Sequence, residues 1–116
     1  MTGKEKFGAF IRRQREAKEL GLREMAKMIE VSPTYLSKCE RDEFPPPAED
    51  KVRKIANIIG CDVDDLLARA NRVSAEITDI IKRHPVELAA LLRTTKGLTA
   101  DDITRLAQQA QKAKDE

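Results

Sequence analysis

The stretch Leu20–Pro47, with the sequence LGLREMAKMIEVSPTYLSKCERDEFPPP, is the part of the chain that decides its fold. Apolar residues at helical spacing predict a short helix from about Leu22 to Ile29. A second helix is expected from about Pro33 to Arg41, after a turn of only a few residues. The segment DEFPPP, residues 42–47, cannot continue as a helix and predicts a rigid extended loop.

Several residues of this stretch suit a tight junction between two crossing helices. Ser32 is a good N-cap, and Pro33 has the preset φ that suits a first helical position. Ala26 is small enough for the point where the helices cross, and Val31 is an apolar residue that can seat the turn on a core. The inward positions of the two helices are apolar: Met25, Ala26, Ile29, Leu36 and Cys39. This layout is a helix-turn-helix, whose second helix enters the major groove of DNA.

Three further helices complete a first domain, which we place at residues 1–73. The first is expected from about Lys4 to Lys18, the fourth from about Ala48 to Ile59, where Gly60 ends it, and the fifth from Asp62 or Asp64 to about Val73. No stretch alternates with a period of two residues, so no strand is expected. The fold class is therefore all-α, with five helices in a compact DNA-binding domain followed by a short C-terminal helical region.

Residues 74–116 form that C-terminal region, in which three short amphipathic helices are expected. Pro85 separates the first two, and Thr99 with Asp102 resembles a capping box that starts the third. The region carries many large apolar residues: Ile77, Ile80, Ile81, Leu88, Leu91, Leu92, Ile103 and Leu106. Three helices of this size rarely bury enough surface to fold alone. We expect the region to form a dimer interface, or alternatively to extend the core of the first domain.

Composition and charge narrow the classes of protein. Charged residues make up 36% of the chain, and no apolar run approaches the length of a membrane span or of a secretory signal. We therefore expect a soluble cytoplasmic protein, associated with the nucleoid, with no membrane partner. Residues 1–41 hold 10 Lys and Arg against 6 Asp and Glu, whereas residues 42–116 hold 12 against 14. This uneven distribution fits one surface that faces a polyanion.

The sequence shows no pattern typical of a metal site or a catalytic site. Cys39 and Cys61 have no Cys or His at metal-ligand spacing, so we interpret both as buried, reduced thiols. The acids of the DVDD segment, residues 62–65, are interpreted as helix N-terminal acids rather than as a cation site. There is no Gly-rich phosphate loop and no nucleophile paired with a base. We expect no enzyme, no cofactor and no metal.

The stretch Leu20–Pro47 resembles the Cro/repressor (XRE) family of prokaryotic regulators. The match includes a helix containing Ala, a Val-Ser turn and a Tyr-Leu-Ser-Lys-x-Glu-Arg helix, and it extends over about residues 5–72. The resemblance implies a lambda-repressor-like five-helix domain. It also implies that two such domains, as a homodimer, bind a palindromic operator in double-stranded DNA and regulate transcription, most often as a repressor.

The resemblance also assigns roles to single residues. It places contacts with base edges on Pro33, Thr34, Tyr35 and Lys38, of which Lys38 can donate to guanine O6 or N7. It places contacts with phosphates on Ser37 and Arg41, which position the protein without reading sequence. A structural ion pair is implied between Arg15 of the first helix and Glu40 of the reading helix.

Some residues depart from the family pattern and leave alternatives open. Leu22 replaces a glutamine that commonly binds phosphate, and Asp42 and Glu43 place negative charge near the expected DNA backbone. Tyr35 suits either a base contact or the edge of the core, and Lys38 could be an ordinary solvated lysine. The alternative function is a protein-interaction module, such as an antitoxin or adaptor, that uses the same fold and binds a protein partner through its C-terminal helices.

Overall fold

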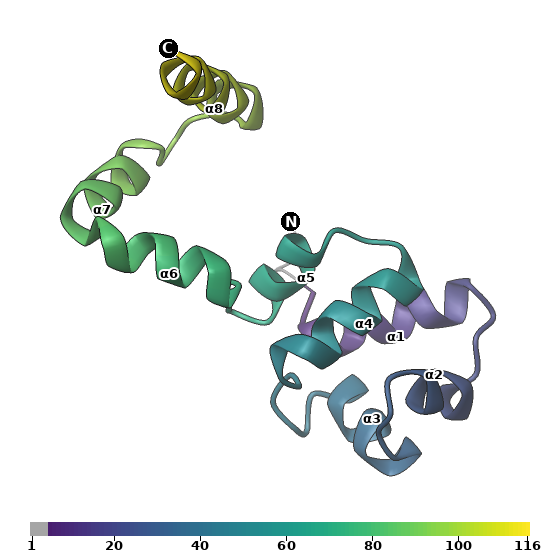
Figure 1. Cartoon of the computed structure of the whole chain (residues 1–116). Coiled ribbons are helices and arrows are strands. Elements are labelled where there is room, and N and C mark those ends of the chain that lie inside the picture. The colour runs from purple at the N-terminus through teal and green to yellow at the C-terminus, as the bar shows by residue number, and fades with distance from the viewer. Residues whose placement is uncertain (1–4) are drawn as a thin grey trace. The chain divides into compact units, whose positions relative to one another are not determined.

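The computed structural model describes residues 5–116, which contain eight α-helices and no strand (Figure 1). The helices are α1 (Phe7–Ala17), α2 (Leu22–Met28), α3 (Pro33–Glu40), α4 (Glu49–Ile59), α5 (Val63–Arg69), α6 (Ala75–Arg83), α7 (Pro85–Thr94) and α8 (Ala100–Asp115). The all-α class and the order of five helices followed by three, both predicted from the sequence, are confirmed.

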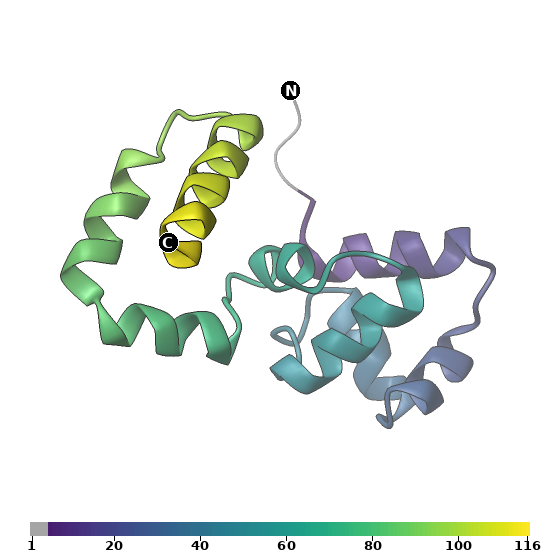
Figure 2. The same ribbon diagram turned by 45° about the horizontal axis from the view of Figure 1, so that its top comes forward.

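The chain divides into two compact units between Ala75 and Glu76. The first unit contains α1 to α5, and the pairs in extensive contact are α4 with α5, α1 with α3, α2 with α3, and α1 with α4. In Figure 1, α2 and α3 lie together at the lower edge of this unit, below α1 and α4. Figure 2 shows the same pair of helices from a second direction, still side by side. The helix-turn-helix is thus held against a scaffold of α1 and α4.

One hydrophobic core joins the five helices of the first unit. Its members are Phe7, Phe10, Ile11, Met25, Ala26, Ile29, Leu36, Val52, Ile55, Ala56, Ile59, Leu66, Leu67 and Ala70. Val31 packs against this core from the turn, as the sequence predicts. Among the described residues the core draws no member from the C-terminal region.

The ends of the helices follow local chemistry. The Ser32 hydroxyl accepts the backbone N–H of Tyr35 at 3.0 Å, and Pro33 occupies the first position of α3. Gly60 ends α4 in the left-handed conformation, with a φ of 76°. Helix α5 ends at Arg69 rather than near Val73 as predicted. Asn71, with a φ of 60°, turns the chain out of the helix there.

The first helix differs from its prediction in two ways. It begins at Phe7, whereas the predicted start at Lys4 lies outside the described residues. Ala17, which we expected on the apolar face, is exposed, and Arg15 takes the last inward position. The two positions are about 200° apart around a helix, so both cannot face the core. Apolar periodicity alone cannot identify a buried arginine.

A buried ion pair connects α1 to the end of α3. The Arg15 guanidinium donates two hydrogen bonds to the Glu40 carboxylate, at 2.8 and 2.9 Å, and both side chains are buried. The remaining nitrogen donates to the carbonyl oxygen of Leu20 at 2.8 Å, in the turn before α2. These hydrogen bonds to the Glu40 carboxylate raise the pKa of Arg15. The pair that the sequence resemblance implies is confirmed.

Asp42, two residues after the end of α3, also stabilises the fold. Asp42 has a φ of 58°, and its carboxylate accepts the backbone N–H of Gly8 in the first turn of α1 at 2.9 Å. The N-cap of α1, Lys6, makes no side-chain capping bond, so Asp42 supplies the cap from a distant part of the chain. Gly8 is required here because a Cβ would lie 2.1 Å from the carbonyl oxygen of Cys39.

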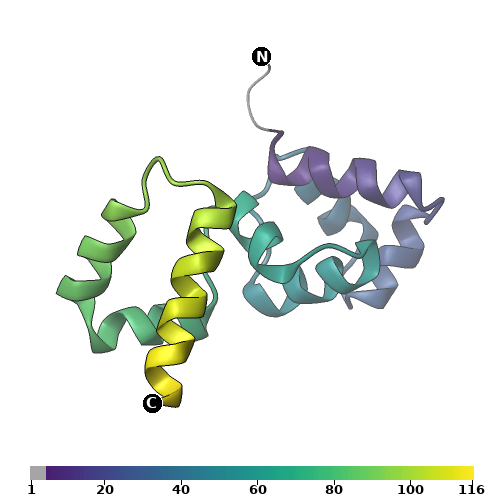
Figure 3. The ribbon, with the colours of Figure 1, turned by 90° about the horizontal axis from the view of Figure 1, so that it is seen from above.

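The second unit, residues 76–116, has no buried side chain. Figures 2 and 3 show α6, α7 and α8 as successive helices that each change direction from the one before. The Thr99–Asp102 capping box that starts α8 is present, as predicted. Large apolar side chains remain exposed: Ile77, Ile80, Val86, Leu91, Leu92, Leu98, Ile103 and Leu106. By themselves, these helices do not cover their apolar faces.

Removal of the buried carboxylate should strongly destabilise the first unit. We expect Glu40→Ala to lower the free energy of unfolding by about 3–5 kcal/mol, because it leaves a buried guanidinium without its partner. Urea denaturation followed by circular dichroism measures this loss. Glu16→Ala is the matched control, since it breaks an exposed pair with Arg12 and should cost about 0.5 kcal/mol or less. Equal losses in the two variants would contradict the assignment.

Asp42 should stabilise the protein through the cap that it gives to α1. We expect Asp42→Ala to lower the free energy of unfolding by about 0.5–2 kcal/mol, as for other capping residues. Asp42→Asn keeps an oxygen acceptor and tolerates positive φ, so it should lose only the charge–dipole part, about 0.3–1 kcal/mol. Thermal unfolding of the three proteins would rank them. A stability of Asp42→Ala at or above that of wild type would show that the contact has no capping role.

Candidate nucleic-acid interface

Helix α3 presents one polar face away from the core. Thr34, Lys38 and Arg41 are spaced at i, i+4 and i+7 and therefore share the centre of this face, with Ser37 and Tyr35 on its two flanks. Thr34 and Arg41 are exposed, whereas the other three are partly buried. The opposite face of the helix is buried: Leu36, Cys39 and Glu40. Leu36 and Cys39 are thus inward, as the sequence predicts.

A shallow depression lies where α2 meets this face. It has a volume of about 330 Å³ and is lined by Leu22, Arg23, Pro33, Thr34, Ser37 and Arg41. Four of the six predicted site residues therefore lie together. Arg23 was missed by the sequence analysis, because a single exposed arginine on α2 gives no signal until the crossing of α2 and α3 is known. Its charge adds to a surface suited to phosphate.

A neighbouring depression brings the first helix to the same side. Its volume is about 190 Å³, and its lining includes Arg12 together with Ser37 and Arg41. Arg12 also pairs with Glu16 at 3.3 Å on the helix surface. The adjacent Arg13 is bound elsewhere, since it pairs with Glu5 at 2.7 Å. Of these two neighbouring arginines, Arg12 therefore lies beside the polar face of α3, whereas Arg13 does not.

Arg41 makes two weak contacts with the chain around it. Its Nε lies 3.4 Å from the Glu43 carboxylate and donates to the carbonyl oxygen of Ser37 at 3.4 Å. Both side chains of the ion pair are about half exposed, at 48% and 52%. An exposed pair of this kind is weak and readily exchanged. A phosphate could replace Glu43 as the partner of Arg41.

Tyr35 and Lys38 meet a third residue that the sequence analysis did not single out. The centres of the Phe44 and Tyr35 rings are 5.8 Å apart, and the Lys38 ammonium lies 5.2 Å from the centre of the Phe44 ring. Burial, and next the hydrogen bond with the Cys39 thiol, raise the pKa of Tyr35. Lys38 is therefore a contact of the loop after α3 as well as a residue of the polar face.

One departure from the family pattern, Leu22, lies at the start of α2. Gly21 is the N-cap, and its backbone N–H donates to the Glu24 carboxylate at 3.0 Å. Leu22, which replaces a commonly phosphate-binding glutamine, packs partly buried against the hydrophobic core. The residue therefore contributes apolar packing at this position.

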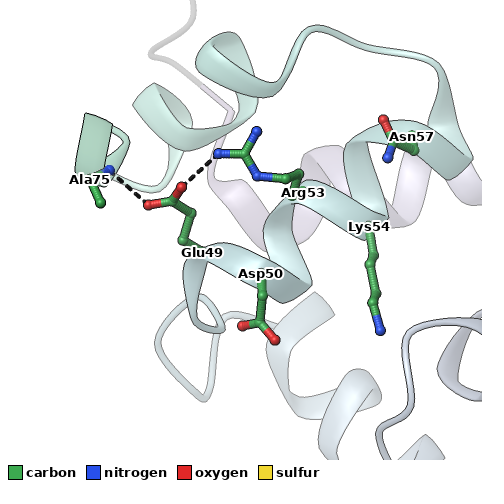
Figure 4. Close-up of a pocket in the computed structure, with 6 residues that line it drawn as sticks. All are labelled: Glu49, Asp50, Arg53, Lys54, Asn57 and Ala75. Atoms are coloured by element: carbon green, nitrogen blue, oxygen red, sulfur yellow. Dashed lines mark hydrogen bonds and ion pairs between the residues drawn. The ribbon is translucent and has the colours of Figure 1, made fainter. Parts of the chain in front are cut away.

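A further depression, on α4, has a volume of about 510 Å³. Figure 4 shows the residues that line it, of which Glu49, Arg53 and Lys54 are paired within the protein. The Glu49 carboxylate accepts from Arg53 at 2.6 Å and from the backbone N–H of Ala75, the first residue of α6, at 2.9 Å. Lys54, also on its lining, pairs with Glu30 of the helix-turn-helix turn at 2.6 Å. These contacts brace α4 against its neighbours in the chain.

Other kinds of site are not found in the described part of the chain. Within residues 5–116, no group of His, Cys, Asp and Glu side chains could hold a metal ion, and no helix is long and apolar enough to cross a membrane. Both cysteines are free thiols. Cys39 is buried as predicted, whereas Cys61 is only partly buried. Desolvation raises the pKa of both thiols.

Solved structures similar to this chain include several bacterial regulators. The clp gene regulator ClgR of Corynebacterium glutamicum is 34% identical, over 56% of this chain and 83% of its own, with a TM-score of 0.47. SinR of Bacillus subtilis, the master regulator for biofilm formation, solved in complex with DNA, is 30% identical, over 53% and 97%, with a TM-score of 0.48. A chain of the SinR protein/SinI protein complex is 20% identical, over 95% and 99%, with a TM-score of 0.50, a likeness of fold alone.

The family of the chain follows from a match to its sequence. No curated protein sequence matches the chain significantly. Residues 6–70, more than half of the chain, match the family described as a helix-turn-helix domain. The matched segment contains α1 to α5, the helices that share the hydrophobic core. The chain therefore belongs to the helix-turn-helix domain family and has the fold of a DNA-binding regulator of the Cro/repressor type.

Proposed function

We propose that this protein is a sequence-specific transcriptional regulator, acting as a repressor, that binds a palindromic operator as a homodimer with α3 in the major groove. The observation that carries this proposal is the polar face of α3, with Thr34, Lys38 and Arg41 at its centre. The two depressions beside it bring in Arg12 and Arg23. A capped, firmly packed helix with an outward polar face is what major-groove reading requires. The function requires no catalytic step.

Within this proposal the residues divide into two roles. Pro33, Thr34, Tyr35 and Lys38 face base edges, because the first turns of the reading helix enter deepest into the groove. The Lys38 ammonium suits guanine O6 and N7, and Thr34 can contact a thymine through its methyl group or hydroxyl. The residues that line the depressions beside this face would bind phosphates: Ser37, Arg41 and Arg23. Occupation of the operator, which would place the protein with the nucleoid, would then block transcription.

The second unit supports dimer formation. A single helix-turn-helix reads few base pairs, so selectivity requires two domains at a fixed spacing, which gives the second contact a high effective concentration. Helices α6 to α8 expose apolar side chains along their length, and none of them is buried. Exposed apolar surface of this extent marks an interaction site. A second copy of this chain is the partner that the operator-binding function needs.

The same observation supports a second candidate function. An exposed apolar C-terminal unit could equally bind a different protein, as in an antitoxin or an adaptor that retains the helix-turn-helix fold. The two functions differ in what purified protein does alone. A regulator selects an inverted repeat from random duplexes, with half-site centres about 10 base pairs apart. An adaptor shows no such selection and remains monomeric until its partner is added.

Two substitutions should separate base reading from phosphate binding on the selected site. We expect Lys38→Ala to cost about 1–3 kcal/mol on that site and to relax the preference at one or two base positions. Arg41→Ala should weaken binding to all sequences about equally and lower the salt slope by about one. Fluorescence anisotropy at several salt concentrations measures both effects. Uniform loss across all sequences in both variants would mean that Lys38 does not read bases.

The C-terminal unit should carry dimerisation. A truncation after Ala75 keeps the whole core and the Ala75 contact with Glu49, so it should stay folded, become monomeric and lose most of its operator affinity. Sedimentation of both forms at tens of micromolar tests this. In the full chain, Ile80→Glu should shift the protein towards monomer, whereas the matched control Gln108→Glu, at an exposed polar position, should not. A monomeric full-length protein, or a truncation that still dimerises, would refute the assignment.

A further inference from the structure

Phe44 is an aromatic residue outside the core whose ring contacts two side chains of the reading helix. It lies in the loop after α3, with 39% of its surface exposed. Its face meets the Lys38 ammonium at 5.2 Å, and its ring packs against Tyr35 at 5.8 Å. A cation over an aromatic face is attracted by the ring quadrupole, and Lys38 here extends over that face. A buried role in folding does not account for this ring.

Backbone hydrogen bonds hold the loop that carries Phe44 against the end of α3. The backbone N–H groups of Glu43 and Phe44 both donate to the carbonyl oxygen of Lys38, at 2.9 and 3.3 Å. The Cys39 thiol lies 3.9 Å from the carbonyl oxygen of Pro45. Three consecutive prolines follow Phe44, and each has a restricted φ. Lys38 is thus bound to this loop through both its backbone and its side chain.

Arg72 fastens the far end of the same loop. Its guanidinium donates to the carbonyl oxygen of Pro46 at 2.9 Å and also to that of Pro47. Arginine presents its donors in a planar fork, so one side chain can hold two successive carbonyl groups. Arg72 follows α5, close to the end of the first unit. The loop is therefore tied to α3 at one end and to Arg72 at the other.

We propose that Phe44 is a specificity-determining residue that positions Lys38 for base reading, and that Arg72 holds the loop that carries Phe44. The proposal rests on the function proposed above. A free lysine side chain samples many rotamers, and fixing it on binding costs entropy. A ring that restrains Lys38 before DNA arrives reduces that cost on the correct base. It adds little to binding that does not use Lys38.

A double-mutant cycle on DNA tests the positioning role. On the selected operator, Phe44→Ala should reduce the preference over a duplex changed at the Lys38 base by about two- to fivefold, the worth of a partly exposed cation–π contact. Affinity for an unrelated duplex should stay unchanged. Phe44→Tyr, which keeps an aromatic face, should retain the preference, and Phe44→Leu should lose it. In a Lys38→Ala background, Phe44→Ala should have no further effect.

Each other outcome overturns the proposal. If Phe44→Ala weakens binding equally with and without Lys38, the ring contacts DNA itself. If Phe44→Ala strengthens binding, the ring withholds Lys38 from DNA. If the wild type selects an operator and Phe44→Ala keeps the full preference, the positioning role fails while the proposed function stands. A wild type without any sequence preference refutes the proposed function, and the positioning role with it.

A measurement without DNA tests the two contacts directly. In the NMR spectrum of the full chain, the ε-methylene protons of Lys38 should be shifted upfield by the Phe44 ring, and Phe44→Ala should abolish this shift. Arg72→Met, which keeps the alkyl stem and removes the guanidinium, should reduce the shift, whereas the control Arg93→Met on α7 should leave it unchanged. A Lys38 shift at its random-coil value, or one unaffected by Arg72→Met, would contradict the corresponding contact.

Discussion

The buried ion pair between Arg15 and Glu40 is the contact on which the geometry of the first unit depends. One guanidinium binds Glu40 in the last turn of α3 and the carbonyl oxygen of Leu20 in the turn before α2. Three elements are thereby fixed by a single side chain. Such a pair adds little net stability compared with apolar packing, but removal of one partner leaves a buried charge. Its value here is the orientation that it imposes on α3.

Because the inward face of α3 is fixed, its outward face has different residues on its two sides. On one side lie arginines from α1 and α2, Arg12 and Arg23, which suit a phosphate backbone. On the other side Phe44 holds Lys38. The acidic residues of the loop are used within the protein, since Asp42 caps α1 and Glu43 pairs with Arg41. The negative charge beside the proposed DNA-binding face is thus partly neutralised by contacts within the protein.

The two units differ in how much of their apolar surface they bury. The first closes one core over five helices, and its exposed surface is mainly polar. The second leaves side chains such as Leu91 and Leu92 in solvent, about half exposed. Apolar burial is the main favourable term in folding, so a unit without it gains stability from association. Dimer formation and order in α6 to α8 would then be coupled.

The sequence by itself determined the helices, the helix-turn-helix and the outward residues of α3. Each of these depends on local signals, such as the Ser32-Pro33 start of α3 and the spacing of Leu36 and Cys39. The sequence could not show that Arg23 joins Thr34, that Asp42 caps a helix 34 residues away, or that Arg72 binds the loop that carries Phe44. Only the tertiary structure decided these contacts, because each joins residues that become neighbours when the helices cross. The apolar periodicity along one helix contains no information about how that helix crosses another.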